Sequence, residues 1–301
     1  MGAAEMVAQG LGRGRARAAT GTLTAAVSLL LLATGCTDNG TAAAIDKPHP
    51  TPAEVVRAAP DVLTRYGTSR SRTSLTMASG GTRISVDGEG GFDYRKRLGH
   101  LTVRLPEGTS GARPGERRLV KEIVVPQALY MKNRGAGVPQ DKWVRLDTTA
   151  LPDGNLVTAG ATDAVSAAEL LRGAREVKYA GRRELDGESV RRYRGTVDLW
   201  AAARNAAPHW RDQLTAAAKG FSERAVPFDA YVDGQGRLRK VRHEFTFAGD
   251  ARKEPGGTEA DGNGGEGVAV SSTTWFHGFG APVTVEMPRS SDIYAGKIAP
   301  F

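Results

Sequence analysis

Cysteine is almost absent from this chain, and so are long apolar runs. A single cysteine, Cys36, occurs in 301 residues, so the chain forms neither an internal disulfide nor a site with several thiolate ligands. The apolar stretch over residues 23–33 is shorter than the roughly 20 residues that a membrane-spanning helix needs. Stability must therefore come from an apolar core, and the 265 residues after Cys36 are enough to build one.

Motifs for catalysis and metal binding are also missing. The histidines lack the spacing of metal ligands, and no G-x-S-x-G motif marks a hydrolase nucleophile. The sequence therefore predicts no catalytic residue, no metal site, no cofactor and no enzymatic activity. We expect each of the five histidines at the surface or at a strand edge: His49, His100, His209, His243 and His277.

The N-terminal segment indicates export. A basic stretch with Arg13, Arg15 and Arg17 precedes the apolar residues 23–33, and small residues follow. This order is typical of a secretory signal peptide. We assign residues 1–35 to that signal.

Cys36 directly follows the small residues that would form the cleavage site. The block 29–36 resembles the lipobox of bacterial lipoproteins, although Ala33 stands where leucine is usual. That resemblance implies diacylglyceryl and N-acyl groups on Cys36, which would anchor the protein to the extracytoplasmic face of the plasma membrane. The alternative is an ordinary secretory signal in which Cys36 is incidental.

The charge balance is mildly basic. The net charge falls from +8 to +6 without the signal, because that segment contains three arginines and one glutamate. Such an excess could face anionic phospholipid headgroups, but a solvated surface is the simpler interpretation. No Lys/Arg cluster is interleaved with aromatic residues, so the sequence predicts no nucleic-acid partner.

Composition divides the exported part into three segments. Residues 36–50 are polar, small and proline-punctuated, which is typical of a flexible tether. Residues 51–290 are expected to form a single domain, interrupted by the low-complexity stretch 249–267, which we expect to be a disordered insertion. Residues 291–301 are expected to form a loose tail.

Helical signals are few within this domain. Thr51, Pro52 and Glu54 form a capping-box pattern that begins a helix running to about Arg65, with a bend at Pro60. Asp163 is a plausible N-cap of a second helix. A third helical stretch covers residues 199–221 and is interrupted at a proline.

Strands dominate the remainder. Alternate residues from Ile84 to Tyr94 share one face, and Gly88 and Gly90 on that face leave room for a bend, a close neighbour or a ligand. The pattern predicts about eleven strands in a mostly antiparallel, meandering α+β arrangement. They are expected at about 74–78, 82–94, 101–105, 119–125, 128–132, 142–147, 176–184, 188–198, 226–233, 237–247 and 268–278.

Several phrases of this domain occur in the order and spacing of a known family. Among them are Leu129-Tyr-Met131, Trp143-Val-Arg-Leu146, Leu170-Leu-Arg-Gly173 and Phe279-Gly280-Ala-Pro-Val283. The chain resembles the actinobacterial LppX/LprA/LprF/LprG-type lipoproteins, which are similar in turn to the LolA/LolB carriers. The resemblance covers about residues 50–288.

This resemblance implies a fold and a function. The implied fold is a strongly curved antiparallel half-barrel whose concave face is covered by helices, with an apolar cavity for acyl chains between the two. The implied partners are membrane lipids or glycolipids, with a membrane transporter as a further possible partner. No ligand-contacting residue of the family can be placed by a motif.

An apolar sheet face can be covered by helices alone or by helices and a ligand. A fully packed core is the simpler alternative, and the glycines together with the resemblance favour a cavity. The candidate wall residues are Ile84, Val86, Phe92, Val103, Met131, Val144, Tyr193, Phe228, Val232 and Phe245. The sequence thus favours a carrier of lipids in the cell envelope, and the alternative is a non-enzymatic sensory or structural module with a filled core.

Overall fold

The structure is a computed structural model that describes residues 49–79, 82–106, 118–134, 137–158, 160–221, 223–247 and 268–296. The expected signal peptide, Cys36 and the insertion 249–267 lie outside the described residues. So do most of the expected tether and the last residues of the tail.

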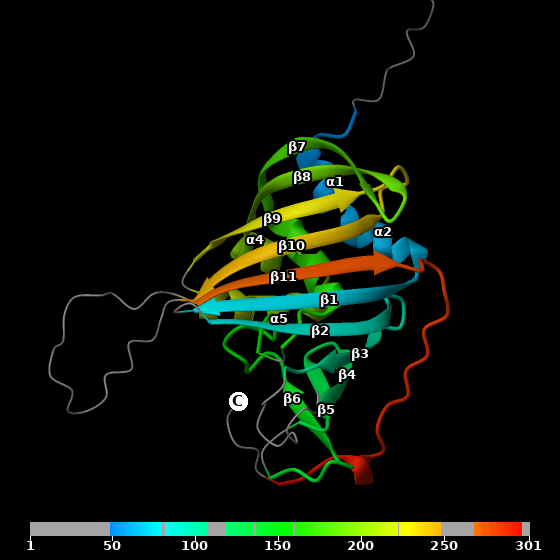
Figure 1. Ribbon diagram of the computed structural model, residues 1–301, viewed down its shortest axis with the longest axis vertical. Helices are drawn as coiled ribbons and strands as arrows, with labels where there is room; N and C mark the ends of the chain where they lie inside the picture. Colours follow the sequence, from blue (N-terminus) through cyan, green and yellow to red (C-terminus); the bar gives the residue numbers. More distant parts are fainter. Residues whose placement is uncertain are drawn as a thin grey trace, which may run out of the picture. The chain divides into compact units, whose positions relative to one another are not determined.

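Eleven antiparallel strands form one open sheet in the order β6-β5-β4-β3-β2-β1-β11-β10-β9-β8-β7 (Figure 1). Two meanders, β1 to β6 and β7 to β11, are joined where β1 pairs with β11. This confirms the predicted antiparallel α+β half-barrel. The strands are β1 Thr68–Ser79, β2 Thr82–Asp93, β3 Leu98–Arg104, β4 Leu119–Val125, β5 Ala128–Lys132, β6 Trp143–Asp147, β7 Ala174–Leu185, β8 Glu188–Asp198, β9 Ala225–Val232, β10 Leu238–Phe247 and β11 Val268–His277.

Short helices cover one face of the sheet, which we call the inner face. The capping box at Thr51 and Glu54 is present, and Asp163 accepts hydrogen bonds from Val165 N and Ser166 N as an N-cap. The first predicted helix is divided at Ala58, two residues nearer the N-terminus than the predicted bend. The helices are α1 Pro52–Arg57, α2 Ala59–Tyr66, α3 Ala164–Glu169, η1 Leu170–Gly173, α4 Leu199–Asn205, η2 Pro208–Trp210, α5 Arg211–Gly220 and η3 Ser290–Asp292.

The centre of the inner face is made of small side chains. Ser71 and Thr73 on β1, with Ser272 and Thr274 on β11, are buried there. All six residues of α3 are buried, and this alanine-rich helix contacts β2, β10 and β11. Small residues on both sides let the helix approach the sheet closely.

Glycines open further space on this face. A Cβ on Gly99 would collide with the ring of Phe92, so the glycine makes room for that ring. A Cβ on Gly88 would meet Thr73 and Leu101. Glycine within these strands therefore serves packing between neighbours.

The segment after β11 has defined contacts and is not a loose tail up to Tyr294. Gly280 N donates to Thr68 O at 3.0 Å, and Tyr294 N donates to Trp143 O at 2.8 Å. Trp143 and Ile293 form an isolated parallel bridge. In Figure 1 this segment, in red, runs from the end of β11 to the edge strand β6.

Candidate functional site

A cavity of about 160 Å³ lies between the helices and the inner face of the sheet. Its apolar lining includes Leu63 of α2, Phe92 of β2, Val165 of α3 and Trp210 of η2. The ring centroids of Phe92 and Trp210 are 6.0 Å apart. A cavity of about 150 Å³ has room for a benzene-sized molecule, so this one, which Asp61, Glu169 and Arg172 also line, has the volume of a short hydrocarbon segment.

One ion-pair cluster closes the rim of this cavity. The guanidinium of Arg172 lies 2.8 Å from Asp61 of α2 and 2.8 Å from Glu169 of α3. Glu169 also accepts a hydrogen bond from Ala207 N at 3.0 Å. Burial lowers the pKa of Arg172, but the hydrogen bonds to Asp61 and Glu169 outweigh it and raise that pKa. The cluster ties together three segments that cover the sheet.

Nine of the ten predicted wall residues are buried, and they face inward by strand register. Ile84 shares that face but is 42% exposed, because it lies near the β1–β2 turn beyond the helices. Only Phe92 lines the 160 Å³ cavity. The other eight pack within the interior: Val86, Val103, Met131, Val144, Tyr193, Phe228, Val232 and Phe245.

Two titratable residues on the inner face were not predicted from the sequence as functional residues. Glu122 of β4 is 2% exposed, and burial raises the pKa of its carboxyl to about 8, although Arg134 lowers it. His243 of β10 is 1% exposed, and burial lowers the pKa of its imidazole to about 3. The surface prediction for His243 is therefore wrong.

Strand alternation could have revealed both residues. Glu122 alternates with Val120 and Val124, and His243 alternates with Val241 and Phe245. Glu122 Oε1 and His243 Nε2 have no hydrogen-bond partner in the described part of the chain. Unpaired buried polar atoms are costly.

Metal ligands and membrane spans were sought in the same described residues. No group of three or more His, Cys, Asp or Glu side chains lies close enough to hold a metal ion there. Among the helices of the described ranges, none combines the length and the apolar character that crossing a membrane requires.

Two mycobacterial lipoproteins are among the solved structures that this chain matches. The chain is similar to the lipoprotein LppX of Mycobacterium tuberculosis. That match has 14% identity and a TM-score of 0.42, and covers 78% of this chain and 98% of LppX. LprF from Mycobacterium bovis matches at 12% identity and a TM-score of 0.42, covering 80% of this chain and 98% of LprF.

A LolA superfamily protein from Nitrosomonas europaea is more distant. It matches at 9% identity and a TM-score of 0.29, with 76% of this chain and 92% of that protein covered. No protein-family model matches the sequence, and no curated protein does either.

Proposed function

We propose that this protein is an exported, membrane-anchored lipoprotein that binds acyl chains of lipids or glycolipids between its helices and the inner face of its sheet. It would carry or present them in the cell envelope without catalysing a reaction. The observation that carries this proposal is the apolar cavity between Leu63, Phe92, Val165 and Trp210. Each methylene transferred into such a space contributes about 0.8 kcal/mol.

Loading a whole acyl chain requires the covering helices to move. The cavity of about 160 Å³ accepts only a segment of such a chain. The helices on its rim are short, with eight residues in α2 and six in α3. In our proposal, rearrangement of the Arg172 cluster lets α2 and α3 separate and extends the cavity along the small residues of β1 and β11.

Cys36 would supply the anchor. Stable attachment to a membrane takes about two acyl chains, so Cys36→Ala is expected to release the protein into the soluble fraction. Membrane fractions from cells that produce each form, washed at high salt, would be compared by immunoblot. Retention of the variant in the washed membranes would contradict the proposed anchor.

The Cys36→Ala chain also gives a direct test of lipid binding, because any lipid on it is held non-covalently. Native mass spectrometry after detergent-free purification from a lipid-containing host should show adducts in the lipid mass range. Fragmentation of the adducts would name the lipid class. A bare protein mass that stays unchanged after incubation with envelope lipids would contradict the proposal.

A matched pair of variants localises the binding. Ala207 is half-buried and lines the cavity, so Ala207→Trp should fill it and abolish most of the adduct. Ala216 is half-buried on α5 and does not line that cavity, so Ala216→Trp should leave loading unchanged. Equal loading of the two variants would place the lipid elsewhere.

A filled-core sensory or structural module is the second candidate. The observation that favours it is the continuous packing of the inner face, where residues from β1 to β11 join the covering helices in one hydrophobic cluster. Such a module would act through a membrane or envelope protein partner. The absence of lipid on the Cys36→Ala chain would favour this candidate.

A further inference from the structure

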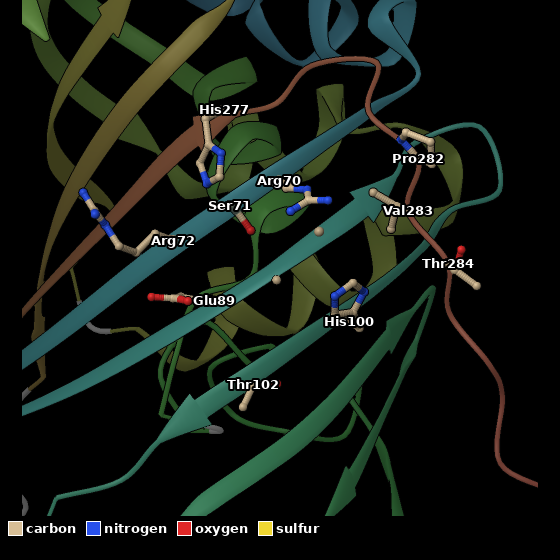
Figure 2. A pocket seen from close by; sticks show the side chains of 12 residues that line it. Arg70, Ser71, Arg72, Glu89, His100, Thr102, His277, Pro282, Val283 and Thr284 are labelled. Carbon is tan, nitrogen blue, oxygen red and sulfur yellow. The ribbon is translucent and has the colours of Figure 1, made fainter. Parts of the chain in front are cut away.

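A larger groove, of about 770 Å³, lies on the outer face of the sheet, opposite the covering helices. Its floor is formed by β11, β1, β2 and β3, and its wall by residues 282–284 of the C-terminal segment (Figure 2). The strand register places four residues in one row across this floor: His277, Arg70, Gly91 and His100.

Gly91 creates a gap in this row. Because no side chain stands there, Val283 of the wall packs against the floor between Arg70 and His100. A Cβ on Gly91 would lie 3.0 Å from Val283 Cγ2. Figure 2 shows Arg70, His100 and Val283 around this space.

The groove is positively charged. Arg70 and Arg72 are exposed in it, and Arg72 lies over the ring of Trp275 at 4.8 Å. Within the described ranges, neither arginine forms an ion pair. Glu89 is the only acidic residue among the described residues that line the groove.

This positive charge affects the pKa of the two histidines in the groove. Burial lowers the pKa of His100, and Arg70 lowers it further. Burial also lowers the pKa of His277, with Arg70 and Arg72 contributing. Both imidazoles are therefore neutral at neutral pH, and each still carries one N–H donor.

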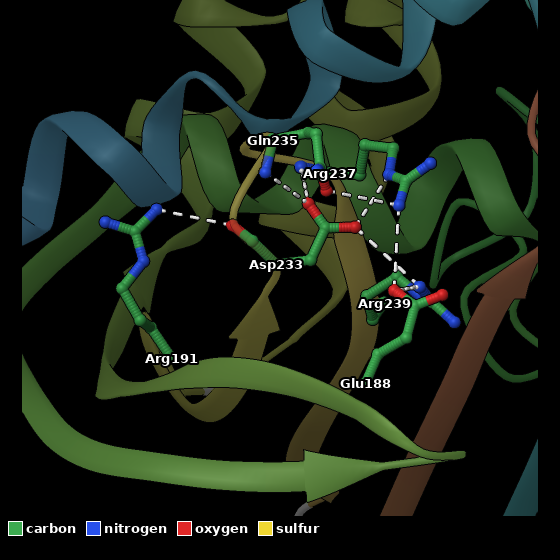
Figure 3. A network of polar contacts seen from close by, with 6 residues as sticks. All are labelled: Glu188, Arg191, Asp233, Gln235, Arg237 and Arg239. Carbon is green, nitrogen blue, oxygen red and sulfur yellow. Dashed lines mark hydrogen bonds and ion pairs between the residues drawn. The ribbon is translucent and has the colours of Figure 1, made fainter.

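A polar cluster holds the C-terminal segment in place just before the residues that form the wall of the groove. Asp233, 2% exposed, accepts hydrogen bonds from Gln235 N, Arg237 N and Arg237 Nε (Figure 3). The guanidinium of Arg237 lies 4.8 Å from the ring centroid of Phe279. Phe279 is three residues before Pro282, so the start of the wall is attached to the turn between β9 and β10.

We propose that this groove binds a phosphoryl anion, held by Arg70 and Arg72 and by N–H donors of His100 and His277. A tetrahedral anion with several acceptor oxygens matches donors that converge from three strands. Guanidinium groups suit phosphate because they offer paired N–H donors and a permanent charge. The anion could be free phosphate or the headgroup of a phospholipid.

The test uses the full chain in neutral detergent micelles, with inorganic phosphate as the probe. Histidine side-chain NMR resonances report the site, and His243, which is buried on the inner face and lines neither the groove nor the inner cavity, is the internal reference. We expect saturable shifts at His100 and His277 and none at His243. A second arm replaces phosphate by micelles doped with phosphatidylglycerol, with phosphatidylcholine as the neutral comparison.

Arg70→Gln should weaken phosphate binding at least tenfold. Arg83→Gln is the matched control: Arg83 is exposed on the same face of β2, away from the groove, and its loss should change affinity less than twofold. A response to phosphatidylglycerol alone would assign the site to a lipid headgroup. Equal effects of the two variants, or no saturable response to either probe, would overturn the proposal.

The pH dependence offers a further check. A bound anion favours protonation of both imidazoles, so the affinity for dimethyl phosphate, a phosphodiester that keeps one negative charge throughout, should rise as pH falls from about 8 to about 6. An affinity for this probe that falls over the same range would contradict the assigned donors. The charged groups around the two imidazoles are Arg70 and Arg72 on β1, Arg239 on β10, Glu89 on β2 and Asp186 in the β7–β8 turn.

Discussion

The two faces of the sheet are built from the same strands yet differ in chemistry. On the outer face, one cross-strand row runs Arg72, Trp275, Lys240, Tyr231, Arg192. Cations alternate with rings in this row: Lys240 Nζ lies 5.1 Å from the Trp275 centroid and 5.3 Å from that of Tyr231.

The residues next to these along each strand point to the inner face. Phe276, Val241 and Ala230 are at most 1% exposed. Because successive side chains of a strand point to opposite sides, a shift of one residue separates a charged surface from an apolar interior. The free energy of folding therefore depends mainly on one face, which leaves the other free to vary in charge.

The largest expected effect contrasts two neighbours on β11. Phe276→Ala empties an inner position and should cost about 4 kcal/mol of unfolding free energy. Trp275→Ala loses the contacts with Arg72 and Lys240, and should cost about 1 kcal/mol. Urea unfolding of both variants, followed by circular dichroism, measures the contrast; equal losses would show that the outer row is as important to stability as the interior.

Adjacent glycines on β2 give a second contrast. A Cβ on Gly90 would collide with the main-chain oxygen of His100, so Gly90→Ala should destabilise the protein by about 3 kcal/mol. A Cβ on Gly91 would lie 3.0 Å from the movable side chain of Val283 and 3.2 Å from Ser69 O, a tight contact but no collision, so Gly91→Ala should cost about 1 kcal/mol. Thermal unfolding of the pair would detect a reversed order, which would contradict this packing.

The smallest expected effect is the change in stability per pH unit that is due to Glu122. Burial raises the pKa of its carboxyl to about 8 in the folded state, whereas in the unfolded chain the carboxyl has its ordinary pKa of 4.5. Between these values the folded state binds more protons, so stability falls as pH rises, by at most about 1.4 kcal/mol per unit. Glu122→Gln should remove this fall.

Urea unfolding at about pH 5 and about pH 7.5 measures this change in slope. Glu89→Gln is the control, because Glu89 is exposed on the outer face and its loss should leave the slope unchanged. A Glu122→Gln variant with the same pH slope as the original chain would show that the buried carboxyl does not titrate as described.

Local sequence determined much of this fold. Period-two alternation predicted eleven strands, and the predicted spans 119–125, 128–132 and 188–198 coincide with β4, β5 and β8. The caps at Thr51 and Asp163 were also predicted correctly. These features depend on backbone geometry and hydrogen bonds over a few residues, which a single stretch of sequence contains.

Only the tertiary structure decided which residues meet across the sheet. The row His277, Arg70, Gly91, His100 crosses four strands and joins β11 to β1, β2 and β3 from the other end of the chain, and its register follows from burying the opposite face. The ion pair of Asp61 with Arg172, which joins α2 to η1, is likewise invisible in local pattern. Alternation within a strand determines which of its side chains face inward, but the pairing between strands determines which outer residues become neighbours.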